Sequence, residues 1–96
     1  LWAIKYDNEV IGFILIADIP HNNSIGFSIN SKYANRGFMR KAWEEISNHP
    51  DIKYPLYAST SQRNESAIRL LESCRFVLES ETVFAGEPSF TYIKRE

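Results

Sequence analysis

The hydrophobic period along this chain switches several times between two residues and a helical repeat, and this pattern restricts the fold more than any other feature. A period of two indicates strands, whereas a period of about 3.6 residues indicates amphipathic helices. Read in order, the segments predict the element order β-β-β-α-β-α-β-β. The chain is therefore expected to form an α+β fold in which a sheet is flanked by helices.

Three strands are predicted before the first helix. Residues 1–6 alternate between apolar and polar side chains, the turn-forming residues 7–9 follow, and residues 10–17 form a continuous apolar run. This pattern predicts a β-hairpin whose second strand is buried on both faces. Residues 20–24 interrupt the pattern, and residues 25–29 resume it with a period of two. We expect this third strand to pair antiparallel with the second.

Two amphipathic helices are predicted in the rest of the chain. The first begins just after Gly37 and ends at the stop signal of residues 48–50. The second follows the polar residues 60–64, of which Ser61 or Asn64 can serve as the N-cap. The apolar side chains at helical spacing are Phe38, Met39, Ala42, Trp43 and Ile46 in the first helix, and Ala67, Ile68, Leu70, Leu71 and Cys74 in the second.

Three further strands complete the predicted order. Residues 54–59 form a short strand between the two helices, and residues 76–84 and 89–93 alternate about a turn at residues 85–88. The chain shows no internal repeat, low-complexity tract or linker. Residues 1–96 are therefore expected to form a single domain.

The composition argues against several classes of function. The chain has 96 residues, 44% of them hydrophobic, which is enough apolar material for one core. Eleven basic and twelve acidic residues give a net charge of -1, so the basic surface typical of nucleic-acid binding is missing. The small cluster of Lys32, Arg36, Arg40 and Lys41 is expected to bind nucleic acid poorly.

Cysteine and histidine usage argue against disulfides and metal sites. Cys74 is the only cysteine, so it has no partner for an internal disulfide, and a reducing, cytoplasmic location fits best. Its place on the apolar stripe of its helix predicts a small buried side chain rather than a nucleophile. His21 and His49 lie far apart without ligand partners, so no metal site is expected. The longest apolar run, residues 11–17, is too short to span a bilayer, and no secretory leader precedes it.

Residues 31–40 carry the main chemical signal. Here a strand ends, a loop with Gly37 follows and a helix begins, so unpaired backbone N–H groups and the positive end of a helix dipole face one spot. Such a spot binds phosphate. Taken alone, Gly37 can also have a purely structural role in the turn, because glycine permits this kind of turn without steric cost.

Two sequence blocks resemble one known family. Residues 25–42 resemble, position by position, the acetyl-CoA loop of the GNAT superfamily of N-acetyltransferases, most closely the branch with ribosomal-protein and aminoglycoside acetyltransferases. Residues 64–76 resemble the family pattern Asn-x-x-Ala-Ile-x-Leu-Tyr-Glu-x-x-Gly-Phe, and Asn, Ala-Ile, Leu, Glu and the last Phe keep their spacing. The hairpin with residues 10–13 is similar to the family's second and third strands. The resemblance therefore covers the whole chain.

The resemblance implies a mixed, mainly antiparallel sheet and an acetyl transfer from acetyl-CoA to a primary amine of a small molecule or a protein N-terminus. The amine attacks the thioester directly in a ternary complex. Residues 27–29 would hold the pantetheine arm and the thioester oxygen, and residues 35–40 the pyrophosphate, with Arg36 or Arg40 supplying charge. Asn64 would contact the pantetheine, unless it only caps its helix. The implied cofactor-binding residues are Phe27, Ser28, Ile29, Ala34, Asn35, Arg36, Gly37, Phe38, Met39, Arg40 and Asn64.

Four positions depart from the family pattern. Ala34 replaces a Gln or Arg, and Met39 replaces a small residue, where a bulky side chain would hinder the approach of the helix to phosphate. Leu71 stands where many members carry a tyrosine that protonates the departing thiolate, and leucine cannot donate a proton. Arg75 replaces a glycine. These departures keep a second hypothesis open, namely a degenerate GNAT-like binding or regulatory module without catalytic activity.

The general base is not evident from the resemblance. By position, Asp18, Ser28 and Glu79 are candidates for a catalytic role, His21 is a further ionisable group, and a chain of water molecules is the alternative.

The acceptor is also open, because in this fold it is selected largely by N-terminal helices and variable loops. A complete GNAT domain places another strand and two helices before the first hairpin, so this chain is expected to lack that N-terminal part. The expected partners are acetyl-CoA and an amine acceptor, without nucleic acid or membrane. Pairing of the C-terminal strands across a homodimer is left open.

Overall fold

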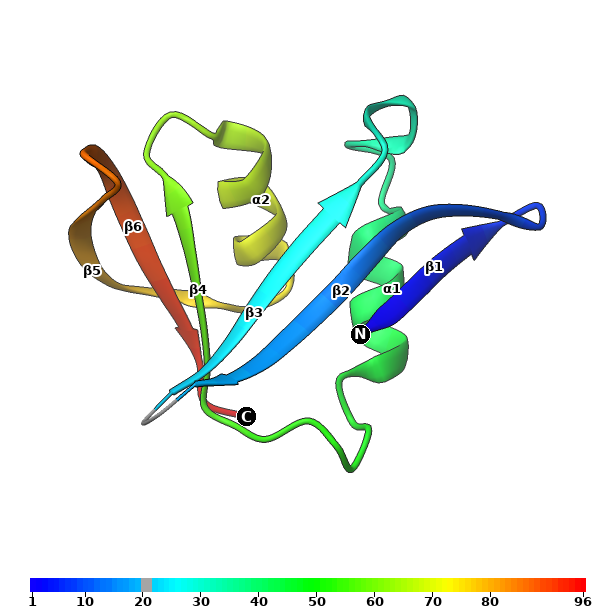
Figure 1. The fold of residues 1–96 in the computed structure, drawn as a ribbon, viewed down its shortest axis with the longest axis horizontal. Coiled ribbons are helices and arrows are strands. Elements are labelled where there is room, and N and C mark those ends of the chain that lie inside the picture. The colour runs from blue at the N-terminus through cyan, green and yellow to red at the C-terminus, as the bar shows by residue number, and fades with distance from the viewer. Residues whose placement is uncertain (20–21) are drawn as a thin grey trace.

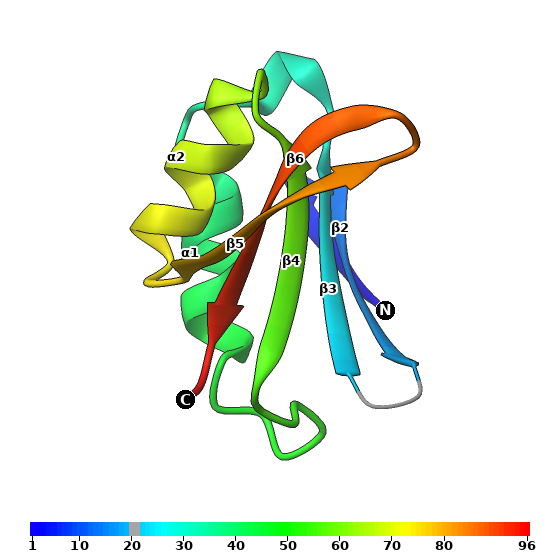
Figure 2. The ribbon, with the colours of Figure 1, turned by 90° about the vertical axis from the view of Figure 1, so that its left-hand side faces the viewer.

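One six-stranded sheet carries both helices on the same face. The computed structural model describes residues 1–19 and 22–96, and the side chains of residues 1–17 and 23–96. The strands follow the order β1-β2-β3-β4-β6-β5, and α1 and α2 cover one face of them (Figures 1 and 2). The elements are β1 (Trp2–Tyr6), β2 (Glu9–Ile19), β3 (Asn22–Ile29), a short 3-10 turn (Ser31–Tyr33), α1 (Phe38–Ile46), β4 (Leu56–Ser61), α2 (Glu65–Ser73), β5 (Val77–Phe84) and β6 (Glu87–Lys94). The predicted α+β class and the predicted element order are confirmed.

Two strands have bounds that differ from the predicted ones. β3 begins at Asn22 rather than at residue 25, because its antiparallel pairing with β2 continues to the pair Ile19 and Asn22. β4 begins at Leu56 rather than at residue 54 and continues to Ser61, because its pairing with β6 extends that far. The predicted turn residues Pro20 and His21 lie outside the described residues.

The last strand also begins earlier than predicted. β6 starts at Glu87 and includes Pro88, which the sequence pattern assigns to a turn. Pro88 pairs with β5 but lies beyond Ser89, the last residue of β6 that pairs with β4. A proline is tolerated at this place because its missing N–H breaks no ladder bond to β4.

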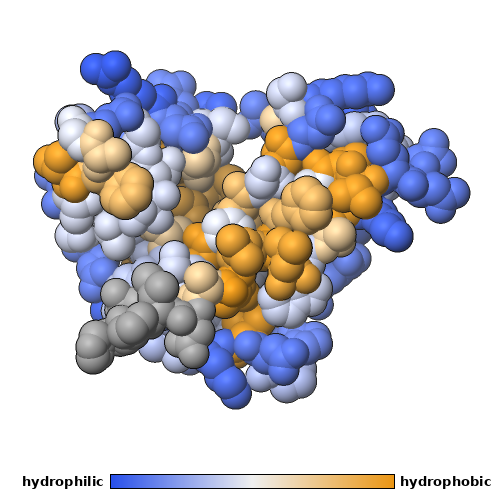
Figure 3. All heavy atoms as spheres, in the orientation of Figure 1, coloured by the Kyte–Doolittle hydropathy of each residue, from blue (hydrophilic) through white to orange (hydrophobic). Residues whose placement is uncertain are grey.

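The prediction that the second strand is buried on both faces is wrong. Ile14 is fully buried beneath the helices, but Phe13 and Leu15, which point to the other face, are 42% and 52% exposed. Both described helices cover the same face of the sheet (Figure 2), so the opposite face carries exposed apolar side chains (Figure 3). A continuous apolar run does not by itself distinguish one covered face from two.

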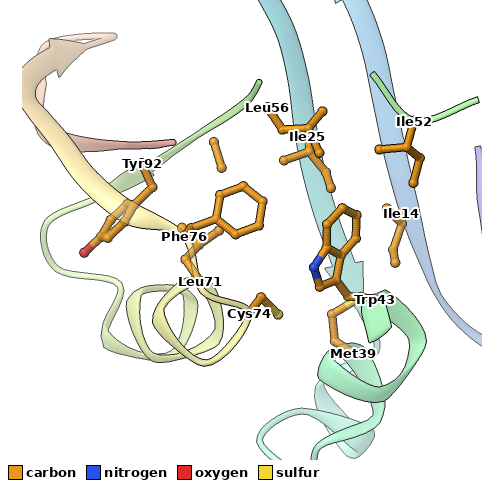
Figure 4. Close-up of a cluster of buried hydrophobic side chains, with 11 residues drawn as sticks. Ile14, Ile25, Met39, Trp43, Ile52, Leu56, Leu71, Cys74, Phe76 and Tyr92 are labelled. Carbon is orange, nitrogen blue, oxygen red and sulfur yellow. The ribbon is translucent and has the colours of Figure 1, made fainter. Parts of the chain in front are cut away.

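The core lies between the sheet and the two helices (Figure 4). Trp43 of α1 is 2% exposed, and its ring centroid lies 5.9 Å from that of Phe76 and 6.2 Å from that of Phe27. Cys74 is buried in the same cluster, as its position on the helical stripe predicts. Each helix has nine residues, and in the described part of the chain no helix is long and apolar enough to cross a membrane.

Strands β3 and β4 separate from one another along most of their length. They pair in parallel at Asn23 with Leu56 and at Ser24 with Tyr57, and beyond these pairs they diverge (Figure 1). The N–H of Asn30 donates to the carbonyl of Ile11 in β2 (2.7 Å). Because alternate residues turn their backbone polar groups to opposite neighbours, residues 27 and 29 turn theirs toward the gap.

Candidate functional site

A pocket of about 780 Å³ occupies the gap between β3 and β4 and extends to the N-terminal ends of both helices. Its lining includes residues from both faces of the sheet: Phe27 and Ala58 point to the helices, whereas Ser28 and Ser59 point to the other face. The pocket therefore lies at the separated edges of the two strands. In the space-filling view the two halves of the sheet stand apart at this place (Figure 3).

The structure brings most of the predicted cofactor-binding residues together around this pocket. Ten of them line it: Phe27, Ser28, Ile29, Ala34, Asn35, Gly37, Phe38, Met39, Arg40 and Asn64. The pocket size lies within the range of ordinary ligand sites. Residues separated by up to 37 positions in the sequence, from Phe27 to Asn64, thus face one cavity.

Arg36 is the predicted residue that does not line the pocket. Its guanidinium lies over two rings, 5.7 Å from the centroid of Tyr33 and 5.4 Å from that of Phe38. Tyr6 of β1 packs against the same two rings, at 6.0 and 4.8 Å. Arg36 therefore closes an aromatic cluster that holds the loop before α1, through cation–π contacts rather than through a ligand.

The N-terminus of α1 presents free backbone donors to the pocket. Gly37 occupies the N-cap with φ of 83° and provides no side-chain cap. The first intrahelical bond runs from the N–H of Lys41 to the carbonyl of Gly37 (3.1 Å), so the amides of residues 38–40 have no partner within the helix. No acidic side chain lies in the first turn, and the positive end of the helix dipole is left uncompensated there.

The pocket lining carries positive charge alone. Among the described residues that line it, the charged side chains are Arg40 of α1 and Arg69 of α2, and none is a carboxylate. Neither arginine forms an ion pair with a described residue. In a chain whose net charge is -1, this is a local concentration of unpaired positive charge.

Sequence reasoning missed Arg69 and Ser66, which also line the pocket. The hydroxyl of Ser66 donates to Oδ1 of Asn35 in the loop before α1 (2.7 Å), and this bond ties α2 to the loop. Arg69 follows Ser66 by three residues, so both lie on one face of α2. The helical period would have placed them together, but the contact with the loop comes from tertiary packing.

Asn64 caps α2. Its Oδ1 accepts a hydrogen bond from the N–H of Ala67 (3.1 Å), as predicted for a helix cap, and the other candidate cap, Ser61, lies in β4. Asn64 also lines the pocket.

Met39 and Leu71 are both core residues at the base of the pocket. They are 4% and 3% exposed and belong to the buried cluster (Figure 4). The pocket remains open beside Met39, because its side chain packs into the core next to Trp43. Leu71 offers no proton. The phenol that does line the pocket, Tyr33, donates its hydroxyl hydrogen bond to Glu9 (3.4 Å).

The three candidates for a catalytic role differ in their position relative to the pocket. Ser28 lines the pocket, whereas Glu79 lies exposed on the edge strand β5 and does not. The side chain of Asp18 lies outside the described part of the structure, as does His21. Within the described residues, no three His, Cys, Asp or Glu side chains form a group that could hold a metal ion.

A family model described as an acetyltransferase (GNAT) domain matches residues 1–77 of this chain. No curated protein sequence matches it.

Solved structures share the fold. An acetyltransferase of the GNAT family from Bacillus cereus is 16% identical, with a TM-score of 0.81 over 98% of this chain and 68% of that one. The ribosomal-protein-S5-alanine acetyltransferase of Vibrio fischeri is 24% identical, with a TM-score of 0.74 over 93% of this chain and 56% of that one. A mutant spermidine N-acetyltransferase from Vibrio cholerae is 18% identical, with a TM-score of 0.78 over 97% and 63%.

The chain thus spans 56% to 68% of the length of these three proteins. The family model covers most of the sequence, including the loop before α1 and the whole of α2. The chain belongs to the GNAT family of acetyltransferases.

Proposed function

We propose that this protein is an acetyl-CoA-dependent N-acetyltransferase that transfers an acetyl group to a primary amine in a ternary complex. The observation that carries the proposal is the charge of the pocket: two unpaired arginines, Arg40 and Arg69, and no carboxylate among its described lining residues. A ligand with several phosphate groups matches such a lining. Acetyl-CoA is a ligand of this kind, and it would supply the acetyl group as a thioester.

The N-terminus of α1 is suited to the pyrophosphate. The amides of residues 38–40 lack partners within the helix, and Gly37 leaves them accessible. Ala34 provides no polar side chain here, but backbone donors do not depend on side-chain identity. Of the two arginines expected to supply charge, Arg40 lines the pocket and Arg36 does not, so we assign the role to Arg40 together with Arg69.

The edge of β3 is suited to the pantetheine arm. The backbone groups of residues 27 and 29 face the gap and have no strand partner there, because β4 has already diverged. An extended arm lying in the gap would satisfy them as an added strand does. A backbone N–H at the same edge would stabilise the oxyanion that forms when the amine attacks the thioester carbonyl.

Proton transfers in this protein depend on groups other than a pocket carboxylate. Within the described residues, no acidic side chain lines the cavity, and Leu71 cannot protonate a thiolate. Water in the open part of the pocket is therefore the proposed carrier of the ammonium proton.

The proposal also places the protein in the cytoplasm, because Cys74 has no disulfide partner in the chain.

Calorimetry with acetyl-CoA and with CoA tests this function on the full-length protein. We expect Arg40→Gln and Arg69→Gln each to weaken binding about tenfold, since each removes a charge-assisted hydrogen bond to phosphate. Arg63→Gln is the matched control, because Arg63 is exposed and does not line the pocket. Absence of acetyl-CoA binding would exclude the proposed function. Binding without acetylation of any amine would instead favour the non-catalytic module.

A further inference from the structure

The loop before α1, residues 34–37, contains two residues in the left-handed region. The φ angles are 60° at Asn35 and 83° at Gly37. Glycine adopts this conformation freely, whereas an asparagine in it is retained where the surrounding structure supports it. The loop leads directly into α1, so its conformation sets the direction of the free amides of residues 38–40. A contact that holds Asn35 therefore acts on the part of the pocket that is proposed to bind pyrophosphate.

The Asn35 side chain is held from α2. The hydroxyl of Ser66 donates to Oδ1 of Asn35 (2.7 Å). Ser66 lies in the first turn of α2, but it is not needed as the helix cap, because Asn64 provides the cap. Asn35 and Ser66 both line the pocket. Their hydrogen bond therefore joins the loop to α2 within the pocket wall.

The aromatic cluster holds both ends of the same loop. The ring centroids of Tyr33 and Phe38, which flank the loop in the sequence, lie 5.7 Å apart. The guanidinium of Arg36 lies over both rings. These contacts fix the ends of the loop, whereas Asn35 is fixed by its bond to Ser66. The conformation of the loop thus depends on two separate sets of contacts.

We propose that Ser66 is a positioning residue, whose hydrogen bond to Asn35 holds the loop before α1 in the conformation that binds acetyl-CoA. The inference rests on the proposed function and adds a residue that acts through the loop rather than on the ligand. Without the bond, the loop occupies the binding conformation for a smaller fraction of the time, and the apparent affinity falls in proportion. The bond is exposed to solvent, so its loss changes the folding stability little.

Calorimetry with acetyl-CoA and urea denaturation test this role on the full-length protein. We expect Ser66→Ala to weaken acetyl-CoA binding about fivefold, which corresponds to about 1 kcal/mol, the typical contribution of one hydrogen bond. Its stability should stay close to that of the unmodified protein, because alanine is a good helix former. Ser66→Thr keeps the hydroxyl and should bind acetyl-CoA nearly as tightly as the unmodified protein.

A double-mutant cycle shows whether Ser66 acts through Asn35. Asn35→Gly removes the acceptor of the hydrogen bond but permits the left-handed conformation. We expect Asn35→Gly to weaken acetyl-CoA binding, and the addition of Ser66→Ala to this variant should not weaken it further. If the two losses add, the hydroxyl of Ser66 does not act through Asn35, and the proposal is wrong.

Ser47→Ala is the matched control. Ser47 is the C-cap of α1, its hydroxyl donates to the carbonyl of Glu44 (3.3 Å), and it does not line the pocket. The substitution therefore removes the same kind of group from the end of a helix without a change in the loop. We expect its acetyl-CoA affinity to equal that of the unmodified protein. A loss as large as that of Ser66→Ala would show that the effect is not specific to the loop.

The outcomes separate this inference from the proposed function. Absence of acetyl-CoA binding in the unmodified protein would overturn the proposed function itself. Binding of equal strength in Ser66→Ala and the unmodified protein would overturn the role of Ser66 and leave the proposed function in place.

Discussion

Gly37 shows how one residue sets the geometry of the cofactor pocket. Its φ of 83° lies in the left-handed region, and this conformation turns the chain from the loop into α1. A Cβ atom at Gly37 would meet no heavy atom within 4 Å, so a side chain there has space but an unfavourable backbone. The sequence alone identified the glycine and the turn, because glycine adopts a positive φ more readily than any residue with a side chain.

Gly37→Ala should lower the free energy of unfolding by about 1–2 kcal/mol, the cost of a left-handed conformation for a residue with a side chain. Gly26→Ala is the control, since its Cβ also meets nothing within 4 Å and its φ is not in that region. We expect the control to be neutral or to stabilise by up to about 1 kcal/mol. Urea denaturation measures both, and equal losses in the two variants would contradict the role given to the turn.

Arg36 shows where residue-scale reasoning failed to place a side chain. The sequence suggests either Arg36 or Arg40 as a source of positive charge for the pyrophosphate. In the structure Arg36 lies over Tyr33 and Phe38, whereas Arg40 lines the pocket. Tyr6, which is far away in the sequence, packs against the same two rings from β1.

At the scale of the element, the position of α2 in the sequence follows from local patterning, whereas its contact with the loop before α1 is a long-range interaction. Its start at Asn64 and its apolar stripe follow from local patterning, and both are found in the structure. Its contact with the loop before α1, through Ser66 and Asn35, is a hydrogen bond between residues 31 positions apart. No periodicity within α2 indicates that partner, because helical spacing defines faces but not their neighbours.

Asn64→Ala should lower the free energy of unfolding by about 1 kcal/mol, because the N–H of Ala67 loses its acceptor. Asn64→Asp keeps an acceptor oxygen and should retain the stability. Thermal or urea unfolding measures this part. If Asn64 also donates its amide N–H to pantetheine, the stable Asp variant should bind acetyl-CoA more weakly than the unmodified protein. Equal affinity would leave Asn64 as a helix cap alone.

For the strands, too, the sequence predicted their positions but not which of their faces are buried. The alternating pattern predicted the strands and the antiparallel pairing of β2 with β3, which the structure confirms. The continuous apolar run of residues 10–17 predicted two buried faces for β2, but the structure leaves Phe13 and Leu15 exposed on one of them. Burial of a face depends on what packs against it, and this information is not local to the strand.

At the scale of the whole molecule, burial connects stability to pH. Burial raises the pKa of the Cys74 thiol above its ordinary value, against a smaller lowering by the hydrogen bond from Ser73. Burial also raises the pKa values of Tyr54 and Tyr92. In each case the folded pKa exceeds the unfolded one, so both states stay protonated at neutral pH. As pH rises past the unfolded pKa, the unfolded chain loses its proton first, and the free energy of unfolding falls.

The free energy of unfolding should therefore change little from about pH 7 to 8 and should decrease more steeply from about pH 8.5 upward, where a free cysteine is about half ionised. Urea titrations across this range measure the decrease. Cys74→Ala lowers stability at every pH because it removes a buried side chain, but its decrease between about pH 8.5 and 9.5 should be shallower. A decrease of the same steepness in both proteins would show that the thiol does not contribute.

The sequence by itself determined the α+β class, the element order and the two blocks that mark the family, because periodicity, turn residues and helix caps act between near neighbours in the chain. Only the tertiary structure determined which residues line the same pocket. The parallel pairing of β3 with β4 ends after Ser24 and Tyr57, and this opens the gap. The hydrogen bond between α2 and the loop accompanies a packing in which Arg69 and Arg40 line the same pocket. These contacts join segments far apart in the sequence, and their formation depends on the packing of the whole sheet rather than on any local pattern.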